Sequence, residues 1–238
     1  MRNGRQLRRQ CAQTGKTRGR AEKAYLFCRA ASWQTASLPH IGDMNTVEKA
    51  IGAAMETLQS LLPQRETIEH AAQLVGDCLT SGRKLLVCGN GGSAADAADF
   101  ATEFACRFVA DRRPYPALNL AACGTLLTAI GNDYGFEQTF ARQVRGFGGK
   151  GDVLVALTTS GNSPNILAAL HAAREIGLVS IALLGREGGQ TRGLATAEII
   201  VPSKITARIQ EAHKFLLHVI CEIVDERLRQ PDSPKLGV

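Results

Sequence analysis

The chain has 238 residues, of which 45% are hydrophobic, 21% are charged and 5% are aromatic. This length supports one substantial globular domain, and the balance of apolar and charged residues excludes a wholly disordered chain. No apolar run reaches the ~18–20 residues that a membrane helix requires, so the sequence predicts neither a membrane-spanning segment nor a membrane partner.

The net charge of +6 is concentrated near the start of the chain. Residues 1–43 hold nine of the 28 basic residues but only two of the 22 acidic ones, a balance of +7. The remaining residues have a net charge of −1, so the charge of the body of the protein does not favour binding to nucleic acid. We interpret residues 1–43 as a disordered or non-native extension; a basic nucleic-acid arm or an organellar presequence is the alternative.

The seven cysteines are odd in number, and no two of them form a C-x-x-C pair. Several lie inside apolar runs, as Cys88 does in residues 85–88, where cysteine acts as a small hydrophobic side chain. This usage favours a reducing, cytoplasmic setting over a disulfide framework.

The body of the chain alternates helices and strands. Asn45 or Thr46 caps the first helix, and the predicted helices are 46–61, 65–80, 93–108, 126–130, 137–147, 165–176 and 205–229. The predicted strands are 84–88, 117–120, 153–157, 179–184 and 198–201. Strands that are apolar throughout indicate a parallel sheet covered on both faces. We expect an α/β fold, an open parallel sheet sandwiched by helices, in one domain over residues 44–230 with a tail at 231–238.

Two polar turns follow buried strands and precede helices, at residues 89–93 (Gly-Asn-Gly-Gly-Ser) and 158–164 (Thr-Thr-Ser-Gly-Asn-Ser-Pro). Backbone N–H groups, hydroxyls and the positive end of the following helix together suit a phosphate. The turns lack Walker and G-x-G-x-x-G spacing, so we expect no nucleotide cofactor. The alternative is a tight connection with ordinary helix capping. Because both turns follow parallel strands, we expect them at one edge of the sheet, around a small phosphorylated ligand.

Four segments resemble the sugar isomerase (SIS) domain, and within it the phosphoheptose isomerase family, namely residues 87–93, 130–135, 159–163 and 207–213. The resemblance runs in order from about residue 44 to 228. It implies a flavodoxin-like doubly wound fold, N-terminal helices used in oligomerisation, and a homotetramer with active sites between subunits. It also implies conversion of sedoheptulose 7-phosphate to D-glycero-D-manno-heptose 7-phosphate, the first step toward heptose for lipopolysaccharide, capsule or other glycoconjugates.

The resemblance also assigns roles to residues. Acid–base roles fall on Glu103 and His218, and we expect Glu103 to be the carbon base and His218 to open the ring or move the oxygen proton. Zinc ligation falls on Asp99, Glu103, Gln210 and His218. Substrate contacts fall on Asn90, Gly91, Gly92, Ser93, Arg107, Asn132, Asp133, Thr158, Thr159, Ser160, Ser163 and Gln210.

Position 99 departs from the family, which normally has histidine there. Asp99 and Glu103 are one helical turn apart and can approach one ion, but a carboxylate makes the site more anionic and favours harder cations. Alternatively, Asp99 is a solvated helix residue. Gln210 and His218 are about 12 Å apart along a helix, so they share an ion only if their side chains lean together or neighbouring subunits contribute. We interpret His213 as a structural or supporting residue.

Two other classes of function remain as alternatives. A relative of the family is a tetrameric scaffold that binds the bacterial replication initiator, but it lacks the final histidine, so His218 favours an enzyme. Sugar-phosphate-sensing SIS modules usually carry a DNA-binding domain, and residues 1–43 show no helix-turn-helix pattern.

Overall fold

The computed structural model describes residues 45–228, so the expected extension at 1–43 and tail at 231–238 lie outside the described residues. Among the described residues, the boundary between two structural units falls between Lys49 and Ala50. The first described helix begins with a capping box. The amide of Glu48 donates to Asn45 Oδ1, and the amide of Asn45 donates to Glu48 Oε2, each at 3.0 Å. This reciprocal pair confirms a capped helix start at Asn45.

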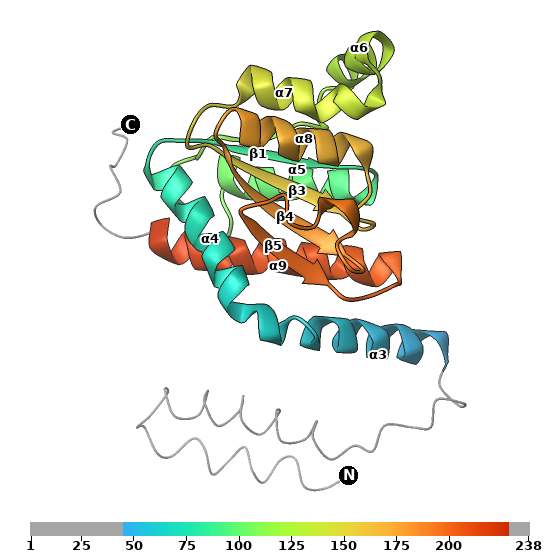
Figure 1. The fold of residues 1–238 in the computed structure, drawn as a ribbon. Helices are drawn as coiled ribbons and strands as arrows, with labels where there is room; N and C mark the ends of the chain where they lie inside the picture. Colours follow the sequence, from blue (N-terminus) through green and yellow to red (C-terminus); the bar gives the residue numbers. More distant parts are fainter. Residues whose placement is uncertain (1–44, 229–238) are drawn as a thin grey trace, which may run out of the picture. The chain divides into compact units, whose positions relative to one another are not determined.

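The described residues alternate helices and strands in nearly the predicted order (Figure 1). The strands are β1 (Leu85–Gly89), β2 (Ala117–Asn119), β3 (Val153–Thr158), β4 (Val179–Gly185) and β5 (Ala197–Val201). The α-helices are α3 (Thr46–Gln59), α4 (Arg65–Thr80), α5 (Gly92–Ala105), α6 (Gly124–Tyr134), α7 (Thr139–Phe147), α8 (Pro164–Glu175) and α9 (Thr206–Leu228). Short 3₁₀ turns lie at Leu62–Gln64, Phe136–Gln138 and Gly189–Thr191. None of the helices within residues 45–228 has both the length and the apolarity needed to cross a membrane.

The five strands form one parallel sheet in the order β2-β1-β3-β4-β5. This is the flavodoxin-like order of a doubly wound fold, in which the direction of winding reverses between β1 and β3. The register places Gly89, at the end of β1, opposite Leu157 of β3. Because ligands bind at the carboxyl edge of such a reversal, the fold places both polar turns where a ligand is expected.

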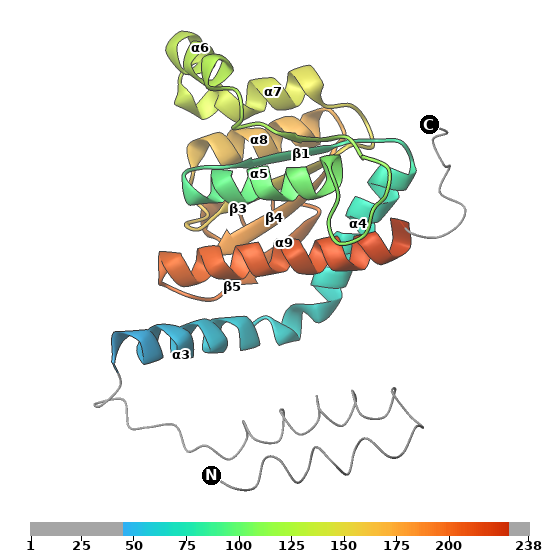
Figure 2. The same ribbon diagram turned by 180° about the vertical axis from the view of Figure 1, so that it is seen from behind.

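Helices cover both faces of the sheet (Figures 1 and 2). In β1, Leu85 and Val87 pack in one hydrophobic core with side chains of α4, α5 and α9, whereas Leu86 and Cys88 pack in a second core with α7 and α8. This alternation follows from the two-residue period of a strand, and burial on both sides explains why the strand is apolar throughout. The predicted sandwich is therefore confirmed.

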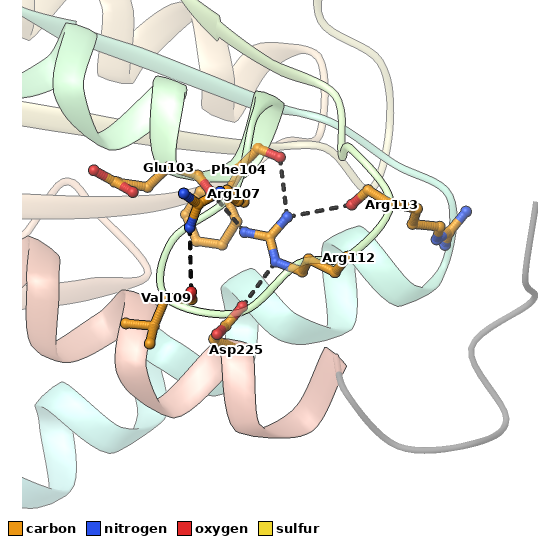
Figure 3. Close-up of polar contacts among 7 residues, drawn as sticks. All are labelled: Glu103, Phe104, Arg107, Val109, Arg112, Arg113 and Asp225. Carbon is orange, nitrogen blue, oxygen red and sulfur yellow. Dashed lines mark hydrogen bonds and ion pairs between the residues drawn. The ribbon is translucent and has the colours of Figure 1, made fainter.

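Helix α5 ends at Ala105, whereas the sequence predicts a helix to residue 108. Its last carbonyls are taken by a side chain from beyond its end: the Arg112 guanidinium donates to the carbonyl oxygens of Glu103 at 2.6 Å and Phe104 at 3.2 Å (Figure 3). Arg112 also pairs with Asp225 at 2.8 Å, and both side chains are almost fully buried. The buried arginine therefore ends α5 and fixes the backbone that carries Glu103.

Candidate active site

The first polar turn joins β1 to α5. Gly91 has φ +54°, a left-handed conformation that glycine adopts without steric cost, and it precedes the first residue of α5. Asn90 and Asn165 exchange two side-chain hydrogen bonds of 2.8 Å each. Since Asn165 lies in the first turn of α8, this pair joins the first polar turn to the helix that follows the second. Asn165 was missed in the sequence because its partner is 75 residues away.

The second polar turn presents its hydroxyls at the end of β3. Thr158 Oγ1 lies 3.2 Å from Ser163 Oγ and accepts a hydrogen bond from the amide of Gly161 at 3.2 Å. Ser160 Oγ accepts from the amide of Asn162, and Thr159 lies half-buried beside it. Ser163 stands at the start of α8 but makes no capping hydrogen bond there. Its hydroxyl is therefore not used in capping the helix, and together with the N–H groups at the start of α8 it is a candidate donor to an anion.

Helix α9 connects the first turn with the candidate catalytic residues. The side-chain amide of Gln210 lies so close to Gly92 that a β-carbon added to Gly92 would overlap the Nε2 atom of Gln210. Ser93, beside Gly92, is buried. Gln210 thus lies at the N-terminus of α5, about two helical turns before Asp99.

Farther along, α5 and α9 lie side by side (Figure 2) and bring together Asp99, Glu103 and His218. One ligand atom from each of these side chains lies within 4.8 Å of the others, and His218 Nε2 is 3.4 Å from Asp99 Oδ2. The ring of His218 also lies 6.0 Å from that of Phe108. The carboxylate and the imidazole to which the family resemblance assigns acid–base roles therefore share one half-buried cluster.

Two charged residues that the sequence analysis did not single out complete this cluster. Lys214 Nζ lies 2.7 Å from Asp99 Oδ2 and 3.3 Å from Asp96 Oδ1. The spacing carries a signal in retrospect: residues 96, 99 and 103 follow one face of α5, and residues 214 and 218 follow one face of α9. The sequence cannot show that the two faces meet.

The electrostatics of the cluster separate its two central carboxylates. The hydrogen bond from Lys214 lowers the pKa of Asp99. Burial, with the nearby charge of Asp99, raises the pKa of Glu103. Burial opposes the charged form of Lys214, but its bonds to Asp99 and Asp96 outweigh that effect and raise its pKa. Asp99 is thus a firmly ionised carboxylate, whereas Glu103 binds a proton more readily than an ordinary glutamate.

Three further predicted contact residues make hydrogen bonds of their own in the described chain, and two of them, Asn132 and Asp133, lie apart from the Glu103 cluster. Arg107 follows the end of α5 and donates to the carbonyl of Val109 (Figure 3). Asn132 and Asp133 are exposed on α6 and are hydrogen-bonded to each other at 2.8 Å. Helix α6 lies at the outer end of the α7 layer, away from α9 in both views (Figures 1 and 2).

Comparisons with known proteins match this architecture. A family model described as "SIS domain" matches residues 48–185, a range that includes both polar turns, and this match defines the class of the fold. A phosphoheptose isomerase of Citrifermentans bemidjiense is 49% identical over 180 residues, which cover 76% of this chain and 93% of that protein. A phosphoheptose isomerase of Geobacter sulfurreducens is 47% identical over a match that covers 79% of this chain and 98% of that protein. The structure of a phosphoheptose isomerase from Francisella tularensis superimposes with a TM-score of 0.70 at 38% identity, covering 77% of this chain and all of that one. The chain belongs to the phosphoheptose isomerase family.

Proposed function

We propose that the protein is an aldose–ketose isomerase that converts sedoheptulose 7-phosphate into D-glycero-D-manno-heptose 7-phosphate, the first step of heptose biosynthesis for lipopolysaccharide, capsule or other glycoconjugates. The observation that carries the proposal is the meeting of Glu103, on α5, and His218, on α9, in one cluster, together with the start of α5 at the first polar turn. The names of the relatives support the same reaction.

The two polar turns hold the phosphate at one end of the substrate. Ser93, Thr158, Ser160 and Ser163, with the N–H groups at the starts of α5 and α8, offer donors without a lysine or arginine. The acid–base cluster lies two to three helical turns along α5 from the first turn, on the order of 10–16 Å. Binding energy from the phosphate thus orients the reacting carbons toward Glu103.

Proton transfer falls to Glu103 and His218. Isomerisation moves a proton between adjacent carbons and another between their oxygens, through an enediol. Glu103 takes the carbon proton. Its pKa is raised toward the working pH, and a general base is most effective when its pKa lies near that pH. His218, on the facing helix, opens the ring or moves the oxygen proton. No step transfers a hydride, so the reaction needs no nucleotide cofactor.

The triad fits a divalent cation, and we propose zinc. The two carboxylates and the imidazole, with ligand atoms within 4.8 Å of one another, supply three protein ligands, the number that catalytic zinc sites use while leaving a position for substrate. Asp99, Glu103 and His218 would hold the ion. Gln210, which the family implies as a further ligand, has its side chain against Gly92, about two helical turns before Asp99, and would have to turn toward the ion to join them. When bound, the ion polarises the carbonyl and enediolate oxygens.

The working assembly that we propose is a cytoplasmic homotetramer with active sites between subunits. Asn132 and Asp133 lie away from the Glu103 cluster within one chain, so they reach a site only if a neighbouring subunit supplies it. Ile51, Met55 and Leu62 are 44–74% exposed near the first helices and offer apolar surface for association.

The test is incubation of zinc-loaded protein with sedoheptulose 7-phosphate, with the product identified by NMR. We expect the heptose 7-phosphate to accumulate. Absence of turnover at any zinc concentration, together with capture of a replication initiator, would instead support a scaffold.

A further inference from the structure

Lys214 lies beside the metal-binding triad of Asp99, Glu103 and His218 and contacts one of its two carboxylates. It is four residues before His218 on α9, and its ammonium group bridges Asp96 and Asp99 at 3.3 and 2.7 Å. The same oxygen of Asp99 is 3.4 Å from His218 Nε2. One carboxylate oxygen that a metal would use is therefore already occupied by a cation of the protein itself.

The charges of the cluster explain why a cation is needed there. Asp96, Asp99 and Glu103 bring three negative charges to one face of α5. Carboxylates this close to one another repel, and the Lys214 ammonium reduces that repulsion in the absence of metal. A divalent ion among Asp99, Glu103 and His218 would neutralise the same charges and would also repel the ammonium beside it.

We propose that Lys214 is an internal counter-ion that competes with the divalent metal for Asp99 and so sets a weak, readily reversible metal affinity. The side chain is 34% exposed and is also bonded to Asp96, so it retains a partner when the metal displaces it from Asp99. The inference rests on the proposed metal site and is independent of the isomerase reaction.

Metal titration of the full chain without substrate tests this directly. Zinc affinity is measured by competition with a chromophoric chelator after treatment with EDTA, for the wild type, Lys214→Met and Lys214→Gln. We expect both substitutions to tighten zinc binding at least tenfold, because each removes a positive charge next to the ion and releases an Asp99 oxygen. Lys214→Arg keeps the charge and should stay close to wild type.

Lys204→Met is the matched control, since this exposed lysine precedes α9 and lies ten residues before Lys214. If the wild type binds zinc, and Lys214→Met and Lys214→Gln bind it with affinities within twofold of the wild type, the role proposed for Lys214 is overturned while the proposed metal site stands. If none of these proteins binds zinc, both this inference and the proposed metal fail, while turnover of the sugar phosphate remains a separate measurement.

Discussion

Gly161 holds the second polar turn against a neighbouring loop, and its replacement by alanine offers a sharp test of the site's construction. Its backbone has φ +67°, and its carbonyl accepts from the amide of Thr191 at 3.0 Å. A β-carbon at this position would overlap the carbonyl oxygen of Gly188 and lie 2.8 Å from the amide nitrogen of Gly189. Both obstacles are backbone atoms, so no rotation of a side chain can relieve them.

The cost has two parts. A non-glycine residue in the left-handed region costs about 1–2 kcal/mol, and forcing an extra carbon into a filled space costs typically 1–3 kcal/mol more. We therefore expect Gly161→Ala to lower the free energy of unfolding by about 2–5 kcal/mol. Gly82→Ala is the control, because Gly82 has φ +72° with no atom within 4 Å of the added carbon. It should cost only the backbone part.

Urea unfolding of the two variants measures the difference. We predict that Gly161→Ala is the more destabilised by at least about 1 kcal/mol, and that its KM for the sugar phosphate rises because the hydroxyls of the second polar turn are displaced. Equal destabilisation of the two variants would show that the turn is not packed against residues 188 and 189.

Two further predictions concern stability. Arg112→Met removes the buried donors to the carbonyl oxygens of Glu103 and Phe104. Because hydrogen bonds to charged groups contribute about 1.5–3 kcal/mol each, we expect the free energy of unfolding in urea to fall by at least about 3 kcal/mol. A loss under about 1 kcal/mol would contradict the structural role of this side chain. Burial lowers the pKa of His213 from 6.5 to about 4, so the unfolded chain takes up a proton at a higher pH than the folded chain does. The free energy of unfolding therefore falls as the pH drops from 6.5 toward 4, by up to about 3 kcal/mol. His213→Leu should lose this part of the pH dependence; unchanged slopes between pH 7 and 5 would show that His213 is not buried in neutral form.

The sequence predicted the layers of the fold because burial on both faces makes each strand apolar throughout. It placed β1, β3 and β4 to within one residue at either end. The end of α5 was wrong, since Arg112 takes the last carbonyls from outside the helix, and no local pattern shows where a guanidinium will fold back. Helix α6 is also longer than predicted, spanning Gly124–Tyr134.

The site was predictable where chemistry is local and unpredictable where helices meet. The two turns could be identified from their glycines and hydroxyls, and parallel strands place such turns at one edge. The pairing of Lys214 with Asp99 spans 115 residues, and the pairing of Asn90 with Asn165 spans 75. Neither pairing follows from spacing along the chain, because it depends on how α5 packs on α9 and how β1 pairs with β3.

The most direct test of the proposed chemistry compares the wild type with Glu103→Gln under identical zinc loading, with sedoheptulose 7-phosphate conversion followed by NMR. The amide keeps the shape of the side chain but cannot accept the carbon proton. We predict that turnover falls by at least about 100-fold, as expected for loss of a general base, while the urea unfolding curve remains that of a folded protein. Conversion by Glu103→Gln at a rate near that of the wild type would contradict the assignment of the base and, with it, the proposed mechanism.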